Sequence, residues 1–160
     1  MVGMADLMVS EDRNLTLCTF PLGSCLGIAI YDPAVKVGGL LHSMLPDSSI
    51  DPKRAAARPG MFLDTGLARL LECAANLKAY KENLLVYVAG GSDVMDETAC
   101  FDIGKRNYAV LAGLLTKHGL RIEAEDVGGL SNRTMQLNLA TGEVSLKFSG
   151  YAKLKSLWKP

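Results

Sequence analysis

Apolar and polar residues alternate along three early segments of the chain, a pattern typical of strands with one buried face. The alternation is clear over residues 14–20, and a mostly apolar run over residues 25–31 predicts a buried strand. Residues 37–45 predict a third strand. Residues 21–24 interrupt the first two strands, and Asp32-Pro33 is a turn signal between the second and the third.

Two longer segments have the apolar spacing of helices. In residues 63–77, leucine and alanine recur three or four positions apart and form one apolar stripe. A second stripe predicts a helix from Ile103 to His118, and Gly119 follows where helices commonly end. Residues 46–59 contain three prolines and no apolar rhythm, so we expect a loop there.

The rest of the chain predicts more strands. The strand-like segments are residues 83–89, 121–127, 133–139 and 143–149, of which the last two predict a hairpin. Strands outnumber helices and the two kinds of element interleave along the chain. We therefore expect an α/β layered sandwich with mixed β-sheets and helices mainly on one side, formed as one domain by residues 1–160.

Composition and charge exclude several classes of protein. Hydrophobic residues make up 49% of the 160 residues, enough for a core, and Lys plus Arg (17) balances Asp plus Glu (17), which argues against nucleic acid as a partner. No apolar stretch reaches the roughly 18 residues of a membrane span, and the N-terminus lacks the basic region of a secretory signal. Four cysteines form no C-x-x-C pair, so we expect reduced thiols and no metal site. Together these features predict a cytoplasmic protein that is not membrane-embedded.

Cys25 stands where a turn re-enters a strand. Such a position can place the sulfur beside free backbone N–H groups, which could bind a developing oxyanion. Gly23 permits the turn. An unpaired cysteine is more often a small buried apolar residue. We keep that interpretation for the other cysteines, Cys18, Cys73 and Cys100.

His42 lies among apolar residues and is one of two histidines. A buried histidine is either a core residue with satisfied ring nitrogens or a catalytic base. If the strands at 25–31 and 37–45 form a hairpin, Cys25 and His42 come near each other, and the imidazole can deprotonate the thiol. The residues alone leave both interpretations open. His118, at the end of the predicted helix, is better explained as a cation that favours a helix C-terminus.

Spaced motifs extend along nearly the whole chain. They are Thr19-x-x-Leu-Gly-Ser-Cys25, His42-Ser-Met-Leu-Pro46, Arg58-Pro-Gly60, Asp64, Gly90-Gly91, Ile103-Gly-Lys-Arg-Asn107, Ala124-Glu-Asp-Val-Gly-Gly129 and Thr141-Gly142. In this order they resemble the CheD family, the chemoreceptor glutamine deamidases of bacterial chemotaxis. The resemblance implies Cys25 as the nucleophile, His42 as its histidine and Thr19 as the third catalytic residue.

The resemblance also implies a reaction and partners. The reaction is hydrolysis of glutamine side-chain amides on receptor helices to glutamate and ammonia, without a cofactor, and it serves adaptation in chemotaxis. Backbone N–H groups around Gly23, Ser24 and Cys25 would hold the oxyanion. Gly90 and Gly91 suit a tight turn or a close backbone approach, or they line the pocket, and we expect residues 46–59 to form part of its rim. A CheC-type phosphatase of phosphorylated CheY is the implied protein partner.

Other functions are compatible with the same residues. The chain could serve chiefly as a binding partner of that phosphatase, although binding alone needs no Cys–His–Thr set. Methylesterase activity on a receptor glutamate, peptide cleavage and amine transfer are chemically open to the same thiol.

Five further residues have structural interpretations. Arg106-Asn107 could cap a helix or brace a loop, and Asp126 could be a turn residue or a pocket wall. Asp93 and Asp96 lack metal-ligand spacing, so we expect a solvated loop there.

Overall fold

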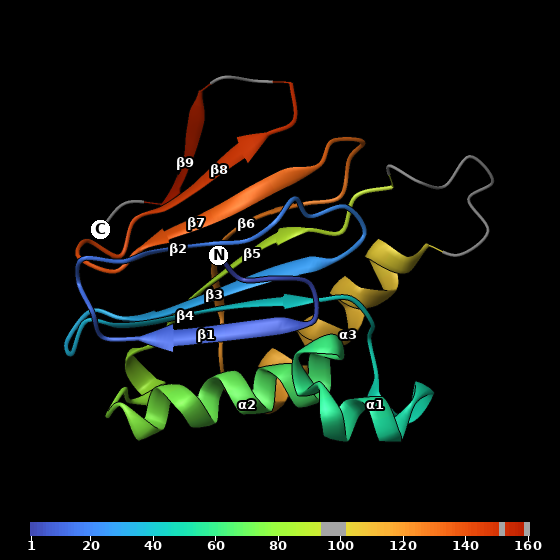
Figure 1. Cartoon of the computed structure of the whole chain (residues 1–160), viewed down its shortest axis with the longest axis horizontal. Helices are drawn as coiled ribbons and strands as arrows, with labels where there is room; N and C mark the ends of the chain where they lie inside the picture. The colour runs from blue at the N-terminus through green and yellow to red at the C-terminus, as the bar shows by residue number, and fades with distance from the viewer. Residues whose placement is uncertain (94–101, 151–152, 159–160) are drawn as a thin grey trace.

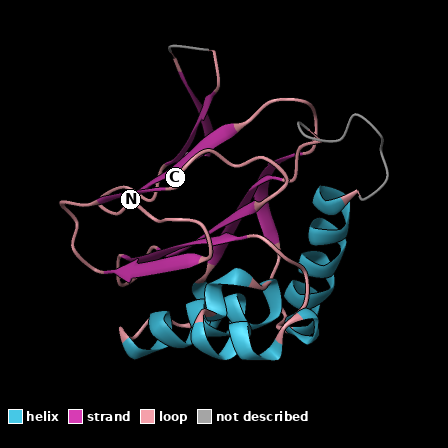
Figure 2. Cartoon of the chain, turned by 45° about the vertical axis from the view of Figure 1, so that its right-hand side comes forward, coloured by secondary structure: helices cyan, strands magenta, loops and turns pink. Residues whose placement is uncertain are grey.

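The computed structural model shows three layers: helices, a five-stranded sheet and a four-stranded sheet (Figure 1). It describes residues 1–93, 102–150 and 153–158. The helices cover one face of the larger sheet, and the smaller sheet packs on its other face (Figure 2). The expected layered α/β sandwich with helices mainly on one side is confirmed.

The five-stranded sheet has the order β1-β4-β3-β5-β6. Its strands are β1 (Asp6–Ser10), β3 (Leu26–Asp32), β4 (Val37–Ser43), β5 (Leu85–Gly90) and β6 (Ile122–Val127). The β5–β6 pair is parallel and the other pairs are antiparallel, so the sheet is mixed. Both β3 and β4 are buried along their whole length, because the sheet is covered on both faces.

The four-stranded sheet is antiparallel, with the order β2-β7-β8-β9. Its strands are β2 (Thr16–Cys18), β7 (Arg133–Asn138), β8 (Val144–Phe148) and β9 (Leu154–Trp158). Buried and half-buried residues alternate along β7, as expected for a sheet with one face on the core. The hairpin expected across Ala140–Gly142 is the β7–β8 pair.

The helical layer consists of α1 (Pro52–Ala57), α2 (Leu63–Asn76) and α3 (Ile103–Lys117). Short 3-10 helices are η1 (Ser48–Ile50), η2 (Pro59–Met61) and η3 (Lys81–Asn83). The apolar stripe of α2 is buried against the five-stranded sheet, as its spacing predicts. His118 caps α3, and Gly119 follows with a positive φ of 69°.

Two parts of the sequence-based prediction were wrong or incomplete. Residues 46–59 do not form an irregular loop, because Asp51 caps α1 through a hydrogen bond from the Arg54 N–H and Pro52 fills the first helical turn. Within the described residues, side-chain hydrogen bonds that link this segment to the rest of the chain join Ser48 to Asp64, Arg58 to the Met4 carbonyl and Thr65 to the Pro59 carbonyl. The expectation that these residues form part of a pocket rim with Gly90 and Gly91 stays a prediction. Strands β1 and β9 were not predicted.

Candidate active site

The turn that precedes β3 is held by backbone hydrogen bonds on two sides. Leu22 pairs with Arg133 of β7 through two N–H to carbonyl bonds of 2.7 and 3.1 Å. On the other side, the Gly91 N–H donates to the Cys25 carbonyl at 2.9 Å. Cys25 is therefore fixed where the two sheets meet, beside the end of β5.

The β3–β4 register relates Cys25 to His42. His42 lies opposite Gly27, two residues after Cys25. Because successive residues of extended chain point to opposite faces, Cys25 and Gly27 point to the same side as His42. That side faces the four-stranded sheet, since Cys25 packs against the core between the sheets. Diagonal cross-strand neighbours of this kind have Cα atoms about 7–8 Å apart, within reach of longer side chains.

Thr19 reaches the same region from the other sheet. It is fully buried directly after β2. Its N–H donates to the Met135 carbonyl at 2.9 Å, and its Oγ1 accepts from the Met135 N–H at 3.0 Å. The Met135 sulfur would lie 3.3 Å from a Cβ built on Gly27, so this pair sits against the part of β3 that faces His42. No hydrogen bond between Thr19 and His42 is found within the described residues.

The imidazole of His42 is buried beneath the N-terminal segment. The Ala5 N–H donates to the His42 carbonyl at 2.9 Å, and Val2 is buried beside Thr19. Burial lowers the pKa of His42 below its ordinary value, and the Val2 backbone carbonyl partly offsets this effect. Neither ring nitrogen has a partner of regular hydrogen-bond geometry in the described part of the chain. The imidazole is therefore neutral at pH 7 and able to accept a proton.

The thiol of Cys25 is partly buried. Burial raises its pKa above the ordinary thiol value, and its own backbone N–H offsets part of the rise. The resting state therefore pairs a neutral thiol with a neutral imidazole. A thiolate would form when His42 takes the proton.

The residues expected around an oxyanion divide into two groups. The backbone N–H groups of Gly23, Ser24 and Cys25 donate to no other described residue outside the strand ladders. The Gly91 N–H is already used by the Cys25 carbonyl. Gly90 has a φ of +110°, and a Cβ there would collide with the Cys25 carbonyl oxygen. Within the described residues, the N–H groups of Gly23 and Ser24 thus have no acceptor and the Cys25 N–H lies beside its own sulfur, whereas the two glycines let β5 approach closely.

Two residues hold the surrounding loops, and sequence reasoning assigned a bracing role only to one of them. Asn107 of α3 is buried and donates to backbone carbonyls near both Cys25 and His42. Arg133, which the sequence did not single out, is also buried. It donates to the Asp126 carboxylate and to the carbonyls of Asp126, Gly128 and Ser131. The sequence does carry a signal for this pair: Asp126 stands near the end of one predicted strand, and Arg133 begins the next.

Asp126 is thereby a structural residue. Its carboxylate also accepts from Lys155 at 3.2 Å, and the loop after it is tied to β5 by a Gly128 N–H to Gly90 carbonyl bond of 2.9 Å. The Asp93 N–H donates to the Gly129 carbonyl. Asp96 lies outside the described residues. Within those residues, no cluster of three or more metal-ligating side chains occurs.

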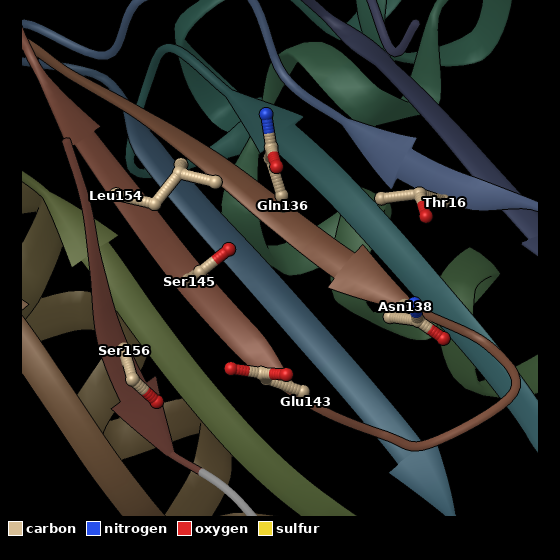
Figure 3. A pocket seen from close by; sticks show the side chains of 7 residues that line it. All are labelled: Thr16, Gln136, Asn138, Glu143, Ser145, Leu154 and Ser156. Atoms are coloured by element: carbon tan, nitrogen blue, oxygen red, sulfur yellow. The ribbon is translucent and has the colours of Figure 1, made fainter. Parts of the chain in front are cut away.

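A polar depression of about 330 Å³ lies on the outer face of the four-stranded sheet (Figure 3). Its side chains are Thr16, Gln136, Asn138, Glu143, Ser145, Leu154 and Ser156. Gln136 pairs with Cys18, which places that cysteine near this outer face. Cys73 lies on α2, and Cys100 is outside the described residues. Among the described cysteines, Cys25 is therefore the one that lies in the turn beside His42.

The fold and these residues define a class of protein: an α/β sandwich with a thiol and a buried neutral imidazole on one face between two sheets. The family model described as CheD chemotactic sensory transduction matches residues 44–148. Thr19, Cys25 and His42 precede that range. The described residues contain no helix long and apolar enough to cross a membrane.

Curated relatives extend the match over almost the whole chain. A probable chemoreceptor glutamine deamidase CheD of Solibacter usitatus is 44% identical over 153 residues, covering 96% of this chain and 90% of the relative. One from Syntrophus aciditrophicus is 45% identical, covering 94% of each chain. One from Pyrococcus horikoshii is 38% identical, covering 91% and 90%. The chain belongs to the CheD family.

Proposed function

We propose that this chain hydrolyses side-chain amides of chemoreceptor glutamines to glutamate and ammonia, with Cys25 as nucleophile. The observation that carries the proposal is the β3–β4 register, which puts Cys25 and His42 on one face between the sheets. The curated relatives are named chemoreceptor glutamine deamidase, which supports this substrate class. Residues 1–160 would act as one deamidase domain, in the cytoplasm, on the cytoplasmic helices of the receptors.

The first half-reaction would form a thioester. The Cys25 sulfur attacks the amide carbon while its proton passes to His42. His42 then protonates the amide nitrogen, the C–N bond breaks and ammonia leaves. The raised pKa of the thiol and the lowered pKa of the imidazole support a proton transfer that accompanies attack, because neither group is charged beforehand.

The backbone N–H groups of the turn would stabilise the tetrahedral intermediates. The N–H groups of Ser24 and Cys25 adjoin the sulfur, and one oxyanion donor typically lowers an acyl-transfer barrier by about 2.7–4 kcal/mol. In the second half-reaction, His42 takes a proton from water, the hydroxide attacks the thioester, and the thiol is regenerated as glutamate leaves.

Thr19 would orient the imidazole. A neutral imidazole has one N–H, and this N–H needs an acceptor so that the other nitrogen can face the thiol. Thr19 Oγ1 accepts from Met135 and has a second lone pair for this purpose. The Val2 carbonyl, which raises the pKa of His42 and accepts from the Phe20 N–H at 3.3 Å, would be a second acceptor.

Mass spectrometry of receptor cytoplasmic fragments tests the proposal. Incubation with the protein in heavy-oxygen water should convert specific glutamines to glutamates that carry one heavy oxygen. The Cys25→Ala variant should not, whereas Cys18→Ala should retain the activity. Unchanged glutamines with the wild-type protein would contradict a deamidase and favour a binding role. Cleavage of the peptide backbone would instead indicate a peptidase, and conversion only of methylated glutamates would indicate a methylesterase.

A CheC-type phosphatase would bind near the same turn and regulate the enzyme during adaptation. Phe20, directly after Thr19, is a half-exposed aromatic residue and supports a contact surface at this place. Receptor deamidation measured against increasing amounts of such a phosphatase should show competitive inhibition. An unchanged rate at saturating phosphatase would place its binding elsewhere.

A further inference from the structure

Asn107 joins the segments that carry Cys25 and His42. Its side-chain amide, on the second turn of α3, donates to the Ser24 carbonyl at 3.1 Å and to the Met44 carbonyl at 3.0 Å. Ser24 directly precedes Cys25, and Met44 is the second residue after His42. One NH₂ group therefore contacts the backbone next to both.

These two segments separate where Asn107 binds them. The β3–β4 ladder ends at the Leu26–Ser43 pair. Beyond it, the Cys25 carbonyl turns toward β5 and accepts from Gly91, whereas the Met44 N–H turns toward η2 and donates to the Met61 carbonyl. Strand pairing therefore does not fix the distance between the Ser24–Cys25 segment and the Met44 segment. The Asn107 amide spans the gap.

Only an amide fits this position among side chains of similar size. Both partners are acceptors, so the group must supply two hydrogens, which an ionised aspartate or a leucine cannot do. The orientation of the amide follows from the same fact. Its Oδ1 is buried and has no partner within the described residues. Packing alone does not explain a buried amide here. The other buried positions of this helix face, Leu111 and Leu115, are leucines among apolar residues, and a buried polar group costs free energy unless it is hydrogen-bonded.

The helix that carries Asn107 is itself placed against the site. A Cβ built on Gly104 would collide with the Gly91 carbonyl oxygen, so the first turn of α3 lies directly on the β5 end. Gly91 in turn donates to Cys25. The helix thus gives Asn107 a fixed base from which to hold the two segments.

We propose that Asn107 is a positioning residue that sets the separation between the Cys25 thiol and the His42 imidazole. This inference rests on the proposed function, in which the two groups exchange a proton. Loss of the amide leaves both strands paired but lets the segments beyond the ladder move apart. A displacement of about 1 Å at reacting groups can lower a rate by about a hundredfold.

The test is a double-mutant cycle read by alkylation of Cys25. Rates of reaction with iodoacetamide, located by mass spectrometry, are measured against pH for wild type, His42→Ala, Asn107→Ala and the double variant. Asn107→Ala should lower the His42-dependent rate by about tenfold or more, and His42→Ala should then add little. In deamidation, kcat should fall with KM nearly unchanged. Additive effects, or a wild-type pH profile in Asn107→Ala, would overturn the inference.

Two further variants separate positioning from folding. Asn107→Asp has the same shape, so it tests the inference if the alanine variant does not fold. It should be inactive when ionised and should recover partly at lower pH, where the protonated carboxyl donates one hydrogen bond. Leu111→Ala, on the same helix, should lower stability and leave the alkylation profile unchanged. If wild-type alkylation shows no dependence on His42, the proposed mechanism fails rather than the role of Asn107.

Discussion

Gly27 lies directly opposite His42 in the β3–β4 ladder, so the position across from the imidazole carries no side chain. A Cβ added there would meet Leu22 Cδ1 at 2.7 Å. Leu22 belongs to the apolar core between the two sheets. The missing side chain therefore lets Leu22 and Met135 pack directly on β3 between Cys25 and the residue opposite His42.

We expect Gly27→Val to abolish activity while lowering the stability of the fold only moderately. The added side chain should lower the free energy of unfolding by about 1–3 kcal/mol, as overpacking does. Because the added side chain also displaces Leu22 and Met135, and Met135 is hydrogen-bonded to Thr19, deamidation and His42-dependent alkylation should be lost even at temperatures where the variant is folded. Circular dichroism on heating and the two rate measurements check this.

A glycine without neighbours provides the control. Gly113 on α3 has no atom within 4 Å of a built Cβ and has a negative φ. Gly113→Ala should raise stability by about 0.4–1 kcal/mol and leave both rates unchanged. Equal activity in the Gly27 and Gly113 variants would contradict the role given to Gly27.

The activity should depend on pH through the neutral pair. In the proposed mechanism, the active form has a protonated thiol and an unprotonated imidazole. Since burial lowers the pKa of His42, the acid limb of kcat/KM should lie below the ordinary value of 6.5. Since burial raises the pKa of Cys25, the alkaline limb should lie above 9.0. A plateau narrower than 6.5–9.0 would contradict this resting state.

Stability should follow the same two groups. Below pH 6.5 the unfolded chain takes up a proton on His42 that the folded chain resists, so the His42 contribution falls as the pH falls. Above pH 9.0 the unfolded chain releases the Cys25 proton that the folded chain keeps, so stability falls as the pH rises. Urea unfolding should show that His42→Ala flattens only the acid side and Cys25→Ala only the alkaline side.

The sequence predicted the elements whose pattern is local. The apolar stripes of α2 and α3 and the strands β3–β8 follow from spacing, because each buries one or both faces. The short helix α1 was missed although Asp51-Pro52 is a helix start signal, since the prolines of residues 46–59 were interpreted as a loop. Strand β9 has mostly exposed residues, so its apolar pattern is weak.

The site itself required tertiary structure. The hairpin of β3 and β4 could be expected, but the register that places His42 opposite Gly27 could not. Asn107 binds Ser24 and Met44, which lie 83 and 63 positions earlier in the sequence, and no local pattern encodes such contacts. The N-terminal cover over His42 was missed for the same reason.

Arg133→Lys should be a destabilising change although it keeps the charge. The guanidinium fork reaches carbonyls of Asp126, Gly128 and Ser131, which a single ammonium on a shorter reach cannot do together. These bonds are partly buried, and a buried carbonyl left without a donor costs about 1–3 kcal/mol, so we expect a total loss of about that size. Urea unfolding measures the loss. Lys155→Met, which removes an exposed partner of the same carboxylate, should change stability by about 0–1 kcal/mol. Equal losses in the two variants would contradict this account.

Removal of residues 1–4 should raise the pKa of His42. Val2 is buried, and its N–H donates to the Cys18 carbonyl at 2.7 Å, so the segment is part of the cover over the imidazole. Burial is the larger cause of the lowered pKa, and its loss outweighs the loss of the Val2 carbonyl. The acid limb of Cys25 alkylation should therefore move to higher pH. Met4→Ser, at an exposed side chain of the same segment, should leave it unchanged. If the acid limb of Cys25 alkylation stays in place after the truncation as well as in Met4→Ser, the segment does not shield His42.

Leu130 should contact the receptor helix that delivers glutamine to Cys25. Its side chain is 81% exposed on a loop that is held to β5 and to Arg133, so a large apolar group is displayed on a fixed support. The same loop lies beside the turn that carries Cys25, since Asn132 Oδ1 is 3.1 Å from a Cβ built on Gly23. Full burial of a leucine contributes about 1.5–3 kcal/mol, so Leu130→Ser should raise KM for a receptor fragment by about tenfold.

The small reagent iodoacetamide does not need that contact. Alkylation of Cys25 and kcat at saturating fragment should therefore be unchanged in Leu130→Ser, because the variant loses binding that is equal in the ground and transition states. Leu154→Ser is the matched control: this leucine is 53% exposed but lines the depression on the outer face of the other sheet. It should leave KM unchanged. If both leucine variants raise KM equally, the receptor does not approach along the loop that carries Leu130. If Leu130→Ser lowers kcat instead, the loop acts on the chemistry and not on docking.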